Sequence, residues 1–173
     1  MFEVGDNVVH PVYGAGTITR IEKRLEGGRD VTYYVIPTEP GTTNLLVPAD
    51  SARDLGLREV IPAARVEDVF DVLKSDPKPP PECKALAGAL KKMDWSDPCF
   101  LAALIRDLLP AERGGGKISA VQRKALKRAQ KLLIGELSLA TGTAYAVTEE
   151  MVVQVIAESP AAQPPKIVEP APA

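Results

Sequence analysis

The residue types of this chain change abruptly near residue 60, and that change constrains the fold more than any other feature. Residues 1–61 are rich in Val, Ile, Thr, Tyr and Gly, whereas residues 62–158 are rich in Ala, Leu, Lys and Glu. A chain of 173 residues is long enough for two small domains. We therefore predict a segregated α+β protein: a β domain over 1–61, an all-α domain over 62–158 and a disordered, Pro- and Ala-rich tail over 159–173.

Five short strands are predicted in the first domain. Glycine and proline bound them, because these residues mark turns and interrupt strand pairing. The predicted strands cover 6–10, 16–25, 30–37, 42–48 and 57–61. Short strands at this density predict a small, strongly bent barrel of the Tudor or SH3 kind.

About five helices are predicted in the second domain, over 63–73, 82–93, 98–109 and 120–141 and from Thr148 onward. Pro98, preceded by Asp97, is a good start for the third helix, and Pro110 with the glycines after it should end that helix. Ser119 and Gly142 should cap the fourth helix, and Thr148 should cap the fifth.

No catalytic or metal-binding constellation is visible. The chain has two cysteines, Cys83 and Cys99, and one histidine, His10, too few for a zinc site. No serine lies in a nucleophile elbow, and the glycine runs lack the spacing of a phosphate loop. We expect His10 to have no titrating role and Trp95 to anchor the turn between two helices by burying aromatic surface. The sequence predicts that the protein is not an enzyme and needs no cofactor or metal.

The location of the protein follows from what the sequence lacks. The N-terminus does not resemble a signal peptide, and no stretch approaches the roughly 20 apolar residues of a membrane span. We expect a cytoplasmic monomer with no membrane partner. The formal net charge of −2 gives no global attraction to nucleic acid, so any such binding needs a local basic face.

One local basic face is present. Residues 84–131 contain eleven Lys or Arg residues and four acids, which leaves a formal charge of +7. Five of these bases recur at helical spacing in the fourth predicted helix and form what we call the basic stripe: Arg123, Lys124, Lys127, Arg128 and Lys131. A polyanion would compensate their mutual repulsion by counterion release, although a solvated face is the commonest fate of such a stripe.

The order of motifs resembles that of the CarD family. The opening FEVGDNVVHPVYGAGTITRIEKR is similar to the GDxVVxPxxGxGxI start of the family's barrel, and LLVPAD is similar to its later VP motif. VEDVFDVLKS resembles the first helix of the family's second domain. ISAVQRKALKRAQKLLIGELSLATG, with its GEL-x-LA run, resembles that domain's most recognisable stretch.

This resemblance implies a bacterial transcription regulator. In the family, the Tudor-like barrel docks on the β subunit of RNA polymerase, and the helical domain contacts promoter DNA at the upstream edge of the melted bubble. The resemblance implies docking residues at Arg24, Tyr34, Leu46 and Pro48. It implies DNA contacts by Lys84 and by Arg123 of the basic stripe. The other four bases of the stripe are predicted to contact DNA from their charge and spacing. Leu46 replaces a basic residue that some relatives carry.

The family's DNA wedge is the main departure. A tryptophan should precede the second helix, near Glu82 or Cys83, and neither residue can insert between base pairs. We predict a regulator that docks on polymerase and modulates initiation through promoter DNA. The alternative is an adaptor that docks on polymerase while its helical domain binds another protein.

Overall fold

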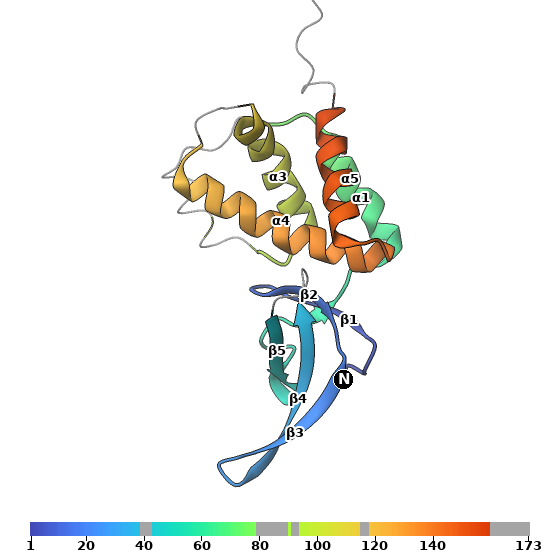
Figure 1. The fold of residues 1–173 in the computed structure, drawn as a ribbon, viewed down its shortest axis with the longest axis vertical. Coiled ribbons are helices and arrows are strands. Elements are labelled where there is room, and N and C mark those ends of the chain that lie inside the picture. Colours follow the sequence, from blue (N-terminus) through green and yellow to red (C-terminus); the bar gives the residue numbers. More distant parts are fainter. Residues whose placement is uncertain (39–42, 79–89, 91–93, 115–117, 160–173) are drawn as a thin grey trace, which may run out of the picture.

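The computed structural model describes residues 1–38, 43–78, 90, 94–114 and 118–159. A curled antiparallel sheet formed by the first part of the chain lies against a helical bundle formed by the second part (Figure 1). The segregated α+β class is therefore confirmed. In the described part of the chain, no helix is long and apolar enough to cross a membrane.

Within the described residues, the sheet has six strands rather than the five predicted. Neighbouring strands follow the order β3-β4-β2-β1-β6. β5 lies outside this path and pairs with β4. The bounds are β1 Asn7–His10, β2 Gly14–Thr17, β3 Arg20–Glu26, β4 Arg29–Thr38, β5 Thr43–Pro48 and β6 Arg58–Glu59. A short 3-10 helix, η1 (Ala49–Ser51), follows β5. The sheet curls into a half-barrel around its own core.

The extra strand arises where the predicted 16–25 strand breaks into β2 and β3. Gly16 pairs with Thr38 of β4 and Arg20 pairs with Val35, so four steps along one strand match three along the other. The additional residue makes a bulge, which bends a strand sharply. Ile18 at this bend is fully buried, and the prediction of one continuous strand was wrong because alternation alone does not reveal a bulge.

The helical bundle consists, in the described residues, of α1 Ala63–Lys74, α3 Pro98–Arg113, α4 Ala120–Thr141 and α5 Tyr145–Ala157. The second predicted helix, 82–93, lies outside the described residues apart from Leu90, which is helical. Ser159, the first residue of the predicted tail, is buried, and its hydroxyl donates to the Lys74 carbonyl at 3.1 Å. Residues 160–173 lie outside the described residues.

The helix ends test the predicted caps. Asp97 caps α3, and its side chain accepts a hydrogen bond from the Cys99 amide. Ser119 and Gln122 form a capping box at the start of α4, and Gly142 ends that helix with a left-handed φ of 66°. These predictions are confirmed.

Two other predicted boundaries were wrong. Pro110 lies inside α3, which continues to Arg113. The last helix begins at Tyr145, so Thr148 is an interior residue rather than a cap; its hydroxyl donates to the Ala144 carbonyl at 3.2 Å. A helix can contain a proline in its final turn, as α3 does, and a threonine whose hydroxyl bonds to a carbonyl one turn back, as α5 does. Packing, and not the residue type alone, therefore decides where these helices begin and end.

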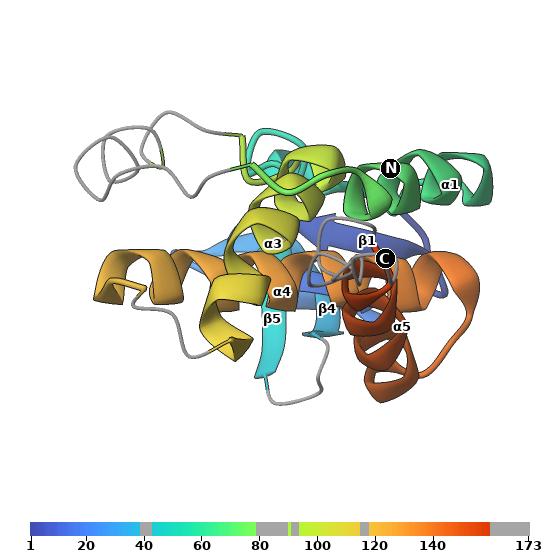
Figure 2. The ribbon, with the colours of Figure 1, turned by 90° about the horizontal axis from the view of Figure 1, so that it is seen from above.

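α4 is the element that joins the two parts of the molecule. Every residue from Leu132 to Ser138 is buried, because β2 covers one side of the helix while α3 and α5 cross the other (Figures 1 and 2). The N-terminal half of α4 keeps a solvated face. α4 is thus buried all round in its C-terminal half and amphipathic in its N-terminal half, and the exposed bases lie on the solvated face of that N-terminal half.

Candidate functional site

The register of β3, β4 and β5 gathers three of the predicted docking residues on one face. Directly paired residues in an antiparallel sheet point to the same side. Glu22 pairs with Tyr33, which pairs with Pro48; Arg20 pairs with Val35, which pairs with Leu46. Arg24 follows on the same side of β3. We call this surface the β3–β5 face: Arg20, Glu22, Arg24, Tyr33, Leu46 and Pro48. Val35 lies on the same side of β4 but is buried.

The β3–β5 face combines an apolar strip with a charged border. Glu22 accepts hydrogen bonds from both Arg20 and Arg24, and these bonds hold the pKa of its carboxyl below the usual value. The Arg24 side chain is 47% exposed, and its guanidinium carbon lies 5.9 Å from the centre of the Tyr33 ring. Leu46 is 37% exposed. An exposed arginine beside aromatic and aliphatic surface is the composition expected of a protein interface.

Tyr34 does not belong to this face. It points to the opposite side of β4, where it is 1% exposed in the sheet's core. Its hydroxyl accepts a hydrogen bond from the Phe2 amide at 3.1 Å. The prediction of Tyr34 as a docking residue is corrected to a core role, and Tyr33 takes its place on the β3–β5 face. Alternation along β4 could have separated the two tyrosines, had the strand's inward side been known.

The basic stripe lies on the N-terminal half of α4. Arg123, Lys124, Lys127 and Arg128 are exposed, and Lys131 is half-buried. Val121, in the first turn of α4, is 39% exposed. Lys84 lies outside the described residues. The stripe therefore presents a row of cations to solvent without an acid of its own helix between them.

Two arginines of the stripe already have partners within the chain. Arg123 lies 3.7 Å from the carboxylate of Glu112. Arg128 donates to the carbonyl of Pro11 at 3.3 Å, and its guanidinium carbon lies 4.0 Å from the centre of the Trp95 ring. Partial burial lowers the pKa of Arg128.

Trp95 has the anchoring role that the sequence predicted. Its indole N–H donates to the Leu90 carbonyl at 3.1 Å, and its ring meets Phe100 edge to face at 6.1 Å. With Arg128 on its face, Trp95 ties the turn before α3 to α4.

A buried ion pair connects the sheet to α4. The carboxylate of Glu136 is completely buried and accepts two bonds from the Arg58 guanidinium, at 2.5 and 2.8 Å, and one from the Ile61 amide at 3.1 Å. Arg58 also donates to the carbonyl of Ser96 at 2.6 Å. We call this arrangement the Arg58–Glu136 latch. Sequence reasoning gave Glu136 no role, although a single acid inside the apolar run LLIGELSLA was a usable signal.

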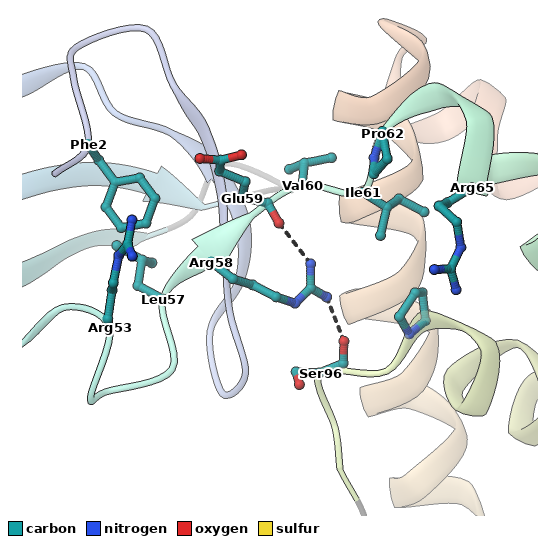
Figure 3. Close-up of a pocket in the computed structure, with 11 residues that line it drawn as sticks. Phe2, Arg53, Leu57, Arg58, Glu59, Val60, Ile61, Pro62, Arg65 and Ser96 are labelled. Carbon is teal, nitrogen blue, oxygen red and sulfur yellow. Dashed lines mark hydrogen bonds between the residues drawn. The ribbon is translucent and has the colours of Figure 1, made fainter.

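An open groove of about 640 Å³ lies beside the latch, between the sheet and the helices. Phe2 and Leu57 line its sheet end, and Pro62 and Arg65 line its helical end, with Arg58 reaching across to Ser96 (Figure 3). The connection from β6 to α1 forms one wall. The groove follows from the way two separate cores meet, and the latch spans it.

Comparison with known proteins fits both halves of this architecture. The model of the "CarD-like/TRCF RID domain" matches residues 2–61. The model of the "CarD, C-terminal domain" matches residues 68–153. The chain belongs to the CarD family. This CarD-family chain is also similar to a Bacillus subtilis (strain 168) protein described as "Putative transcription factor YdeB", with 26% identity over 157 residues, 88% of this chain and 97% of the relative. Membership of the CarD family indicates a role in transcription regulation.

Proposed function

We propose that this protein docks on the β subunit of RNA polymerase through the β3–β5 face and modulates initiation by holding its helical domain against promoter DNA. The observation that carries the docking proposal is the convergence of Arg24, Leu46 and Pro48 on one exposed face. The family resemblance named these three residues separately. They lie on the same side of the sheet because of the register between β3, β4 and β5.

The DNA part of the proposal is supported by the basic stripe. Residues 120–131 carry five bases and no acid. Cations in a row along an exposed helix attract phosphates and gain affinity through counterion release. The Arg58–Glu136 latch supports a fixed geometry, because a protein that bridges polymerase and DNA needs its two contact surfaces in one orientation.

Docking is tested by calorimetric titration of the full chain with the isolated outer lobe of the cognate polymerase β subunit. Arg24→Glu should weaken binding strongly, since it reverses a charge within the β3–β5 face. Lys23→Glu is the matched control: it makes the same charge change one residue away, on the opposite side of β3. Equal weakening by both variants, or no binding by the folded wild-type chain, would refute docking through this face.

The adaptor alternative is favoured by one observation: Arg123 and Arg128 are already engaged by Glu112 and by Pro11 and Trp95. DNA titration over a range of salt concentrations separates the two functions. If the stripe binds phosphate, the double variant Arg123→Glu/Lys127→Glu weakens binding and flattens the salt dependence. An unchanged titration would favour the adaptor.

A further inference from the structure

The β1–β2 turn places exposed apolar side chains beside the basic stripe. This turn, Pro11–Tyr13, joins β1 to β2 and packs against α4. The Arg128 guanidinium donates to the Pro11 carbonyl at 3.3 Å. The next residue, Gly14, has a φ of 97° and lies next to Leu132, because a Cβ built on it would be in van der Waals contact with the Leu132 Cδ2 atom at 3.8 Å.

Both side chains at the tip of the turn are exposed to solvent. Val12 is 57% exposed and Tyr13 is 44% exposed. Neither residue belongs to the buried core of the sheet or of the helices. The Tyr13 ring contacts His10, with ring centres 5.0 Å apart and a tilt of 54°, which orients the ring while leaving much of it in solvent.

The position of the turn along α4 is set by Arg128. Lys124 lies one helical turn before Arg128 and Lys131 one turn after it, and residues three or four apart are neighbours on a helix surface. Both lysines therefore flank the point where the turn touches the helix. An aromatic and an aliphatic side chain thus project from the sheet domain at the middle of a row of cations from the helical domain.

This combination has a specific chemical match. Cations alone suit any polyanion, but cations interleaved with an exposed aromatic ring suit a nucleic acid, whose phosphates alternate with flat, apolar base and sugar surfaces. We infer that the β1–β2 turn is part of the DNA-binding surface, with Tyr13 contacting a base or sugar of duplex DNA whose phosphates lie along the basic stripe. This inference rests on the proposed DNA contact of the stripe and extends it to the sheet domain.

The Arg58–Glu136 latch matters for this DNA-binding surface, which combines Tyr13 with the basic stripe. Tyr13 and the stripe belong to different parts of the chain, so they form one surface only while the sheet and α4 keep their relative position. The Arg58–Glu136 latch and the Arg128–Pro11 bond hold that position.

Site-specific photocrosslinking tests the inference directly. A benzophenone amino acid replaces Tyr13 in the full chain, and the probe is a labelled duplex with a short mismatched bubble. Position 25 is the control, because Leu25 is 74% exposed at the far end of β3, in the hairpin that extends away from the helices (Figure 1). Crosslinking to DNA at position 13 and not at position 25 is the expected result.

Affinity measurements show what the ring contributes. Tyr13→Ala should lower DNA affinity about fivefold or more, the loss expected for one base–aromatic contact, with an unchanged salt slope. Tyr13→Phe should bind as well as the wild type. Lys124→Ala is the contrasting variant, because it should reduce the salt slope by about one. Fluorescence of Trp95 verifies that each variant is folded.

The outcomes separate this inference from the proposed function. If Arg123→Glu/Lys127→Glu weakens DNA binding but position 13 neither crosslinks nor affects affinity, the turn is not part of the surface and the stripe acts alone. If position 13 crosslinks to a polymerase subunit and not to DNA in a complex of all three, the turn binds protein and the inference is wrong. If the chain binds no DNA at all, both the proposed DNA contact and this inference fail.

Discussion

Replacing Arg58 with alanine should destabilise this protein more than replacing Glu136 with alanine, although the two residues form a single ion pair. The asymmetry follows from burial. The Glu136 side chain is completely buried, whereas the Arg58 side chain is 29% exposed. Without Arg58, a buried carboxylate keeps only the Ile61 amide as a donor among the bonds described above.

Magnitudes follow from these environments. Breaking a buried pair so that a charge is left uncompensated costs about 3–5 kcal/mol, which is the expected loss for Arg58→Ala. Glu136→Ala leaves a guanidinium that still donates to the Ser96 carbonyl and can reach water, so the expected loss is about 1–3 kcal/mol. The double variant should resemble Glu136→Ala, because the stranded carboxylate is then absent.

The assay is urea unfolding followed by tryptophan fluorescence. The chain has one tryptophan, Trp95, which directly precedes the latch residue Ser96, so its emission reports this region. Arg20→Ala is the control, since it breaks an exposed, solvent-screened pair with Glu22 and should change stability little. Equal losses for Arg58→Ala and Glu136→Ala, or additive losses in the double variant, would refute the reasoning.

Two further predictions concern the sheet. Gly16→Ala should lower the free energy of unfolding by about 3 kcal/mol, because the added Cβ would lie 2.2 Å from the Pro37 carbonyl oxygen, a backbone atom that cannot move aside. Gly27→Ala, whose added Cβ meets no atom within 4 Å, should lower it by about 1 kcal/mol. Urea unfolding measures both losses, and comparable losses at the two positions would contradict this account. The His10 Nδ1 atom accepts a hydrogen bond from the Val12 amide, and burial lowers the pKa of His10. The unfolded chain therefore binds a proton on His10 more tightly than the folded chain does. The free energy of unfolding should fall as pH drops below the usual histidine pKa of about 6.5. His10→Gln should lose less stability between pH 7 and about pH 5, and parallel pH curves for variant and wild type would count against this prediction.

Local chemistry let the sequence predict a large part of this fold. The segregated α+β class follows from the change of residue types near residue 60, and the bounds of α4 follow from Ser119 and Gly142. The basic stripe is also local, since helical spacing alone puts its members on one side of α4. Caps, periodicity and charge spacing act over one or two helical turns, and that is the range over which a single sequence can be interpreted.

Pairing between distant segments was decided by the tertiary structure. The β3–β5 face depends on register and on which side of β4 is buried. For that reason the sequence prediction named Tyr34, which lies in the core, although the half-buried Tyr33 is the tyrosine on that face. The bulge between β2 and β3 likewise needs the partner strand to be seen.

The contacts between the two parts of the chain were also beyond the sequence. Arg58 and Glu136 are 78 residues apart, and Arg128 and Pro11 are 117 apart. The sequence by itself determined the fold class, the bounds of α4 and the charge that its exposed face carries. Only the tertiary structure decided which side chains meet, because a contact between distant residues depends on how the sheet and α4 pack together and on no local preference of either residue.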